Sequence, residues 1–165
     1  MLYSLIQINE SSPYRVLEYE EDTACFVTDG GVVYMVGFIL ETNMDIPDAY
    51  QLFITPRGRT KNVGIDAKIG QTIAEIVKSF FKNHDNILVY ICDTSDKMQA
   101  ARHRKFQMWF HQYAGTKYFE FISETIKVEE DEYFAAMIMK KSHKHFHETI
   151  NTFHQYFRDL REKLG

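Results

Sequence analysis

The sequence predicts an α+β fold: a single domain with a mixed, largely antiparallel sheet and about three main helices. Three observations predict this class. β-Rich runs separated by turn residues fill the first third, a strand–helix–strand unit occupies the middle, and two further β-rich runs precede a long amphipathic stretch. With 165 residues and 45% hydrophobic side chains, the chain is long enough to bury a core without disulfides and too apolar to be disordered.

Residues 1–55 are predicted to form a strand meander. The β-rich runs cover residues 14–19, 24–28, 32–40 and 50–55. Asp29-Gly30-Gly31 separates the second run from the third and indicates a hairpin, because glycine reaches positive φ without strain. Residues 2–8 fit either a short strand or a helix, and Pro56 is expected to end the last strand.

Residues 56–141 are predicted to contain a helix, a strand, a second helix and a closing hairpin. Asp66 can cap the first helix, whose apolar residues recur at three- and four-residue spacing: Ile69, Ile73, Ile76, Val77, Phe80 and Phe81. The apolar run 87–92 indicates a strand covered on both faces. A helix from residue 97 to about 113 follows, and residues 117–128 and 132–141 form two long strands joined at 129–131.

Residues 142–165 are predicted to form a C-terminal amphipathic helix. Its apolar side chains alternate steps of four and three along one face: Phe146, Ile150, Phe153, Phe157, Leu160 and Leu164. No linker, repeat or low-complexity tract interrupts the chain, so one domain over residues 1–165 is expected.

The formal net charge of −4 is unevenly distributed. Residues 1–50 carry a balance of −8, residues 51–117 a balance of +6, and residues 118–165 a balance of −2. The positive charge of the middle segment is compatible with the binding of a small anionic ligand. The N-terminus lacks the pattern of a secretory signal, and the longest apolar run has about half the length of a membrane helix, so a soluble, cytoplasmic protein without membrane contact is expected.

The element order resembles that of the GNAT N-acetyltransferases over residues 14–141, with the last helix as an addition. In that family a meander leads into a basic, glycine-containing loop that binds the pyrophosphate of acetyl-coenzyme A at a helix N-terminus. The residues at the matching place are Arg57, Gly58, Arg59, Lys61 and Gly64. The resemblance implies an acyl-coenzyme A-dependent N-acyltransferase with acetyl-coenzyme A as its cofactor.

Two features depart from the GNAT pattern. Asp66 stands where the family's loop has a small residue, and its carboxylate would repel a pyrophosphate. Phe106 and Phe110 stand where the family often has a tyrosine that acts as a general acid, and phenylalanine cannot donate a proton.

A second resemblance is local. The stretch Ile91-Cys92-Asp93-Thr94-Ser95-Asp96, followed by Arg102-x-Arg104-x-Phe106 and Trp109-Phe110, is similar to the signature of a small uncharacterised bacterial family. This resemblance implies no known activity.

The same stretch supplies the main candidate site, which consists of Asp93, Thr94, Ser95, Asp96, Arg102 and Arg104. It follows a central strand, where ligands of α/β sheets often bind, and its carboxylates, hydroxyls and guanidinium groups suit acid–base or phosphate chemistry. The alternative is structural: Asp96 and Gln99 form a capping box, and Arg102 makes an internal ion pair with Asp93 or Asp96.

Metal and nucleic-acid sites are weaker interpretations. His143 and His147 have a spacing that can ligate a metal, but no HExxH pattern occurs and the apolar stripe turns them, with His145 and His154, toward a solvated face, so no metal site is predicted. The basic segment 97–117 contains Trp109 and Phe110, yet these aromatic side chains fall on the core stripe, which argues against nucleic acid as a partner.

Two main classes of function remain, with a nucleic-acid-associated protein as a third alternative. The first is a non-catalytic interaction or regulatory module that binds a protein partner or a small anionic ligand through residues 93–104 or an aromatic patch. The second is the acyltransferase, and whether the chain is an enzyme is left open. The first is favoured because the glycine loop departs from its pattern and no catalytic acid is visible.

Overall fold

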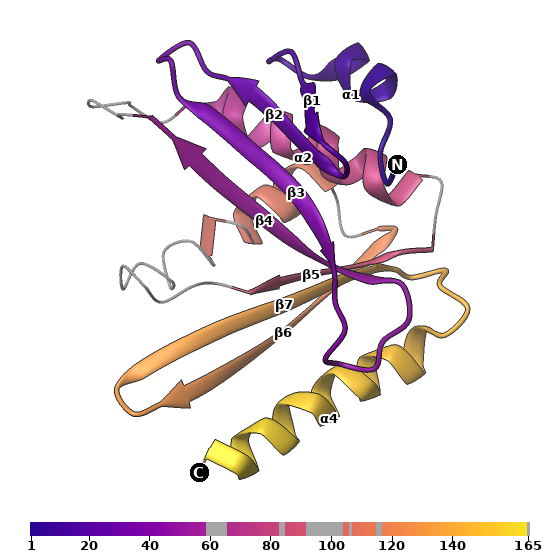
Figure 1. Cartoon of the computed structure of the whole chain (residues 1–165). Helices are drawn as coiled ribbons and strands as arrows, with labels where there is room; N and C mark the ends of the chain where they lie inside the picture. The colour runs from indigo at the N-terminus through magenta and orange to yellow at the C-terminus, as the bar shows by residue number, and fades with distance from the viewer. Residues whose placement is uncertain (59–65, 83–84, 92–103, 106, 115–116, 165) are drawn as a thin grey trace. The chain divides into compact units, whose positions relative to one another are not determined.

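The computed structural model describes residues 1–58, 66–82, 85–91, 104–105, 107–114 and 117–164. The predicted fold class is confirmed: seven strands form a mixed, mostly antiparallel sheet in the order β1-β2-β3-β4-β5-β7-β6 (Figure 1). The helices with defined bounds are α1 (Leu5–Ser11), α2 (Ala67–Lys82), the π-helical turn η1 (Phe110–Ala114) and α4 (Phe146–Leu164). Two compact units divide the chain; unit 1 is Met1–Ile39 with Leu52–His84, and unit 2 is Leu40–Gln51 with Asp85–Gly165.

Unit 1 contains the predicted meander. Strands β1 (Leu17–Glu20), β2 (Thr23–Val27) and β3 (Val33–Leu40) are antiparallel neighbours. The hairpin expected at Asp29-Gly30-Gly31 is confirmed, because the N–H of Gly31 donates to the carbonyl of Thr28 at 2.9 Å and Gly31 has φ of +80°. Of residues 2–8, which fitted either a strand or a helix, residues 5–8 begin the helix α1, and Ser4 caps it through its side chain.

Helix α2 forms as its apolar spacing predicts. All six predicted apolar residues are buried, and the Phe80 ring stacks on Phe38 of β3 with ring centroids 4.5 Å apart. Gly37 of β3 leaves space for an aromatic side chain of β4 (Ala49–Arg57), because a Cβ at Gly37 would lie 2.2 Å from Cζ of Phe53. Strand β4 continues one residue past Pro56, so the expected end of this strand was wrong. The φ angle of proline is compatible with a strand, and proline disturbs a sheet only where a neighbouring strand needs its missing N–H as a hydrogen-bond donor.

Unit 2 contains the parallel part of the sheet. Residues Ala49, Tyr50 and Gln51 of β4 pair in parallel with Ile87, Leu88 and Val89 of β5 (Ile87–Ile91). Strand β7 (Asp131–Lys140) pairs antiparallel with β5 on one side and with β6 (Phe119–Val128) on the other. The predicted closing hairpin is confirmed with ten paired residues on each strand, and its turn is Glu129-Glu130.

Residues 41–48, between β3 and β4, form a loop ordered by one buried carboxylate. Glu41 accepts a hydrogen bond from the backbone N–H of Asn43 at 2.8 Å and another from the side-chain amide of Gln51. Asp45 and Asp48 both have positive φ, at 56° and 57°, which aspartate tolerates better than most residues. The carbonyl of Asp48 accepts from the N–H of Ile87, which ties the loop to β5.

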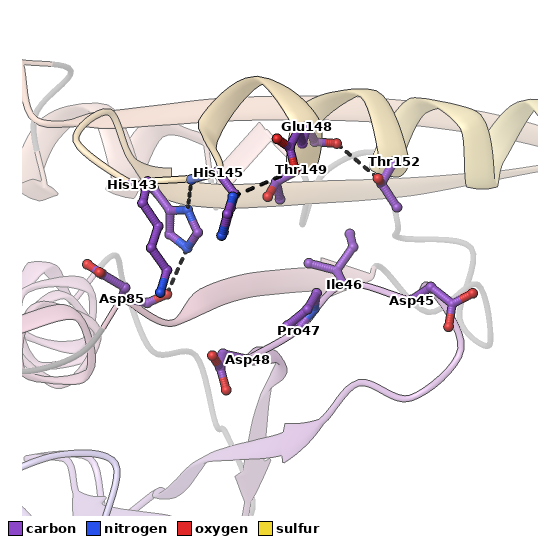
Figure 2. Close-up of a pocket in the computed structure, with 11 residues that line it drawn as sticks. Asp45, Ile46, Pro47, Asp48, Asp85, His143, His145, Glu148, Thr149 and Thr152 are labelled. Atoms are coloured by element: carbon purple, nitrogen blue, oxygen red, sulfur yellow. Dashed lines mark hydrogen bonds and ion pairs between the residues drawn. The ribbon is translucent and has the colours of Figure 1, made fainter.

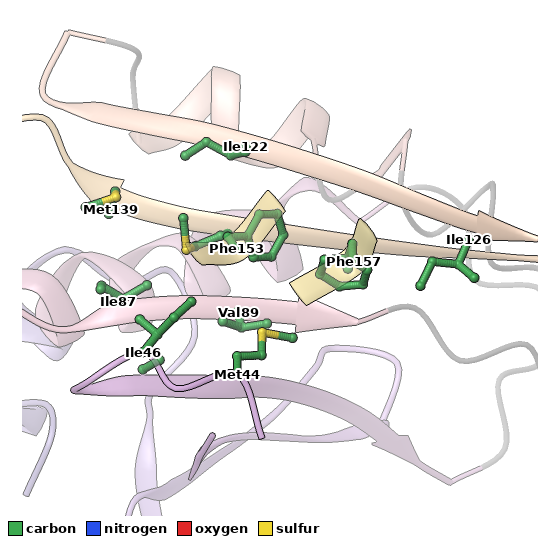
Figure 3. Close-up of a cluster of buried hydrophobic side chains, with 12 residues drawn as sticks. Met44, Ile46, Ile87, Val89, Ile122, Ile126, Met139, Phe153 and Phe157 are labelled. Carbon is green, nitrogen blue, oxygen red and sulfur yellow. The ribbon is translucent and has the colours of Figure 1, made fainter. Parts of the chain in front are cut away.

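Helix α4 covers one face of the sheet in unit 2, as its predicted apolar stripe requires. Phe153 and Phe157 are buried against side chains of the sheet and of the 41–48 loop, including Ile87, Val89, Ile122, Met44 and Ile46 (Figure 3). Phe146, Ile150 and Leu160 pack around this core and are partly buried. The stripe thus fixes the helix to the sheet, and the hollows described below lie beside it.

The helix predicted between residues 97 and 113 is described only in its second half. Residues 104–105 and 107–109 are helical, and the last described turn is the π-helical segment η1. Phe110 is buried and its ring lies 5.2 Å from that of Phe121 on β6, which agrees with a core position. None of the described helices is both long and apolar enough to cross a membrane.

Candidate functional site

Two hollows lie beside α4 within unit 2, one toward each end of the helix. The first half of α4 lines a polar pocket, and the second half lines an apolar groove. The 41–48 loop contributes to both, with Asp45, Ile46, Pro47 and Asp48 in the pocket and Met44 in the groove. Helix α4 and this loop therefore set the geometry of both candidate sites.

The polar pocket has a volume of about 410 Å³. It is lined by three short segments and one helix face (Figure 2): the loop residues Asp45, Ile46, Pro47 and Asp48; Asp85 before β5; His143, Lys144 and His145 after β7; and Glu148, Thr149 and Thr152 of α4. The lining contains four carboxylate side chains and one lysine. The negative charges outnumber the positive one, so the pocket favours cationic over anionic ligands.

His143 has both ring nitrogens engaged in hydrogen bonds. Its Nδ1 accepts from the backbone N–H of His145 at 3.0 Å, so its Nε2 bears the proton and donates to the carbonyl of Asp85 at 3.1 Å. This tautomer ties the segment after β7 to the residue before β5 (Figure 2). His145 lies 3.6 Å from Glu148 and is more than half exposed. Within the described ranges, no group of three or more His, Cys, Asp or Glu side chains could hold a metal ion.

The apolar groove has a volume of about 260 Å³. Its walls come from the 41–48 loop, the end of β5, the β6–β7 hairpin and α4, and the lining side chains are Met44, Ile91, Ile126, Val128, Tyr133, Phe134, Ala135, Tyr156, Phe157, Leu160 and Leu164. Among them, only the hydroxyls of Tyr133 and Tyr156 are polar. Leu164 is 52% exposed and Ile91 is 41% exposed, so the groove opens to solvent with apolar side chains at its mouth.

An ion-paired glutamate holds α4 to β6 beside the groove. The carboxylate of Glu124 is only 14% exposed; it contacts Nδ1 of His154 at 2.5 Å and accepts a hydrogen bond from Arg161. Burial raises the pKa of Glu124, but the hydrogen bonds and charges of His154 and Arg161 outweigh burial and hold that pKa below its ordinary value. Arg161 also donates to the carbonyl of Thr125 at 2.9 Å. This contact set fixes one wall of the groove.

Most of the residues predicted as a site lie outside the described part of the chain. These are Asp93, Thr94, Ser95, Asp96 and Arg102 of the main candidate, together with Arg59, Lys61 and Gly64 of the glycine loop. Arg104 is helical and exposed. Arg57 ends β4, and Gly58 follows it with φ of +116°, a conformation that favours glycine. The main candidate site therefore stays a prediction.

Asp66 occupies the N-terminus of α2, as predicted for a cap. Its carboxylate accepts from the backbone N–H of Lys68 at 2.9 Å and from the hydroxyl of Tyr14. Burial is the main reason why the pKa of Tyr14 is raised, and the hydrogen bond and charge of Asp66 raise it further. The backbone N–H of Lys68, which could otherwise bind an anion at the N-terminus of α2, is therefore already bonded to the Asp66 carboxylate.

The sequence interpretation missed the groove and misjudged two histidines. His143 and His154 are half-buried and hydrogen-bonded, whereas a solvated face was predicted for them. The groove had one sequence signal: the apolar stripe of α4 continues to Leu164, beyond the residues that the core covers. The contribution of the 41–48 loop had no comparable signal, because its apolar residues Met44 and Ile46 stand among polar ones.

The fold and the two hollows define an α+β protein with an apolar groove and a polar pocket along one helix. Residues 65–155, more than half of the chain, match a family of unknown function (DUF6169), and the chain belongs to this family. The matched residues include the stretch 91–110 that resembled an uncharacterised family. No curated protein matches the chain and neither does any solved structure, so the resemblance to the GNAT acetyltransferases is not confirmed.

Proposed function

We propose that the chain is a non-catalytic interaction module that holds an apolar segment of a protein partner in the groove beside α4. The observation that carries this proposal is the lining of the groove: eleven described residues, none of them charged, with the hydroxyls of Tyr133 and Tyr156 as the only polar groups. Apolar side chains that face solvent together, such as Ile91 and Leu164, are typical of interaction surfaces.

The size of the groove favours side chains of a partner over a whole small molecule. Its 260 Å³ is below the about 300 Å³ at which small-molecule pockets begin. The groove is also an open channel along a helix rather than an enclosed cavity with convergent polar groups. Such a surface can take up a few apolar side chains presented at regular intervals by one segment of a partner.

A peptide panel tests this proposal. Three dye-labelled amphipathic 18-residue helices share one leucine stripe and carry lysine, glutamine or glutamate on the polar face. Fluorescence anisotropy should show that at least one of them binds the full chain. Leu164→Glu places a charge at the mouth of the groove on an already exposed residue, so it should weaken that binding about tenfold without unfolding the chain.

Ile6→Glu is the matched control. Ile6 is 79% exposed on α1, outside the groove, so the same chemical change there should leave peptide binding as in the wild type. If no peptide binds at millimolar concentration, or if both variants lose binding equally, the groove is not the interaction site. Circular dichroism of both variants shows whether the fold is kept.

A second candidate function is acyl-coenzyme A binding with transfer to an amine. It is favoured by the observed succession of a meander, Arg57-Gly58 at the end of β4, helix α2, strand β5 in parallel with β4, and a closing hairpin. The capping carboxylate of Asp66 argues against this function, because its negative charge would repel the pyrophosphate of the cofactor. Acetyl-coenzyme A should raise the melting temperature if it binds, by mass action, and more so for Asp66→Asn, which keeps an N-cap but removes the charge. No shift at millimolar ligand in either protein would exclude this function.

A further inference from the structure

The tip of the β6–β7 hairpin carries an acidic run beside the groove. Glu129, Glu130, Asp131 and Glu132 are consecutive, and the first three are exposed. The residues that flank this run, Val128 and Tyr133, both line the groove. Between residues 120 and 139, Lys127 is the only basic side chain. In the part of the chain that the structure describes, none of the four carboxylates has a hydrogen bond or an ion pair. Lys127 stands opposite Glu132 in the hairpin register, so the end of the groove keeps an excess of negative charge.

We propose that the groove takes a basic amphipathic helix of a partner protein, with its apolar face against α4 and the hairpin and its lysine or arginine side chains against residues 129–132. This inference rests on the proposed function and adds the charge and the conformation of the partner. An excess of carboxylates attracts cationic groups, and it disfavours an acidic peptide or an anionic membrane surface at the same place.

The construction of the groove favours a helix over an extended strand. Ala135 of β7 pairs with Ile91 of β5 on one side and with Glu124 of β6 on the other, so β7 has no free edge in the floor of the groove, and the outer edge of the sheet belongs to β6. An added strand would need such a free edge for its backbone hydrogen bonds. Along the helix wall, Tyr156, Leu160 and Leu164 stand four residues apart and form one row. A row of this kind interdigitates with the row of a second helix.

The same peptide panel tests the charge of the partner. At low salt the lysine peptide should bind about tenfold more tightly than the glutamine peptide, and the glutamate peptide should bind least. Raising the salt concentration should reduce this preference, because the hairpin carboxylates are exposed and screened. The triple variant Glu130→Gln, Asp131→Asn, Glu132→Gln should lose the preference and still bind the glutamine peptide as the wild type does.

A charge-matched control uses a second acidic cluster. The triple variant Glu18→Gln, Glu20→Gln, Glu21→Gln removes three exposed carboxylates from unit 1 and should keep the full preference for the lysine peptide. Equal binding of the lysine and glutamine peptides to the wild type at low salt overturns the inference while leaving the proposed function intact. So does tighter binding to anionic vesicles than to any peptide. Absence of all peptide binding refutes the proposed function itself.

Discussion

Glu124→Gln tests how α4 is held to β6. The change keeps the shape of the side chain and removes the charge that meets His154 and Arg161. Hydrogen bonds to charged groups contribute about 1.5–3 kcal/mol each, and a glutamine oxygen can still accept one of the two. We therefore expect the free energy of unfolding at pH 7 to fall by about 2 kcal/mol.

Glu120→Gln is the matched control on the same strand. Glu120 lies 3.9 Å from Lys141, and both side chains are more than 40% exposed. Exposed ion pairs contribute about 0–1 kcal/mol, so this variant should stay within about 0.5 kcal/mol of the wild type. Urea denaturation followed by circular dichroism measures both variants under the same conditions.

The effect of Glu124→Gln should depend on pH. The pKa of Glu124 in the folded chain is lower than its ordinary value of 4.5, so the stability that its charge contributes is present above the unfolded pKa. That contribution is lost as the pH falls from about 4.5 through the folded pKa, because the carboxylate then becomes neutral. The difference between wild type and variant should be full at pH 7 and smaller at pH 3. An equal difference at both pH values, or none at pH 7, would refute the reasoning.

Three further predictions concern unit 1. Gly37→Ala should lower the melting temperature, at a cost of about 1–3 kcal/mol, because its Cβ would lie 2.2 Å from the ring of Phe53; an unchanged melting temperature would show that the ring moves aside freely. Tyr3→Phe should raise the stability by about 1 kcal/mol, because the Tyr3 hydroxyl is buried and has no hydrogen-bond partner among the described residues. Burial and nearby carboxylates raise the pKa of Tyr3 to about 12, so absorbance titration of this variant should lack one tyrosine step near pH 12. Asp66→Ala should cost about 0.5–2 kcal/mol in thermal unfolding and Asp66→Asn less, since asparagine also caps; equal losses would point to the contact with Tyr14 instead.

Elements with strong periodicity were predictable from the sequence. The stripes of α2 and α4, the apolar run of β5 and the Asp-Gly hairpin all form at or within a few residues of their expected places. Each depends on local spacing or on one turn residue, and these signals do not need knowledge of distant neighbours. Pro56 was misplaced as a strand end because its effect depends on whether a partner strand needs its N–H, which a single sequence does not state.

The candidate site was less predictable because its walls come from distant segments. Met44, Ile91, Tyr133 and Leu160 line one groove, yet no spacing rule connects these positions. Likewise, the partner of His143 is a backbone carbonyl at Asp85, 58 residues away, and carbonyl partners leave no trace in side-chain patterns. The predicted candidate residues were chosen because they carry reactive groups at the end of a strand. This criterion finds only sites that use reactive side chains, and it does not find an apolar groove.

The path of the chain through the two units has a consequence for dissecting this protein. The chain passes from one unit to the other after Ile39, after Gln51 and after His84, so unit 2 is not a contiguous stretch of sequence. A fragment that begins at Asp85 would lack Met44, Ile46 and Ala49, which belong to the buried core under α4. The family match begins at residue 65 and omits the same side chains. A continuous fragment that contains all of unit 2 starts at Leu40 and necessarily carries residues 52–84 of unit 1 with it.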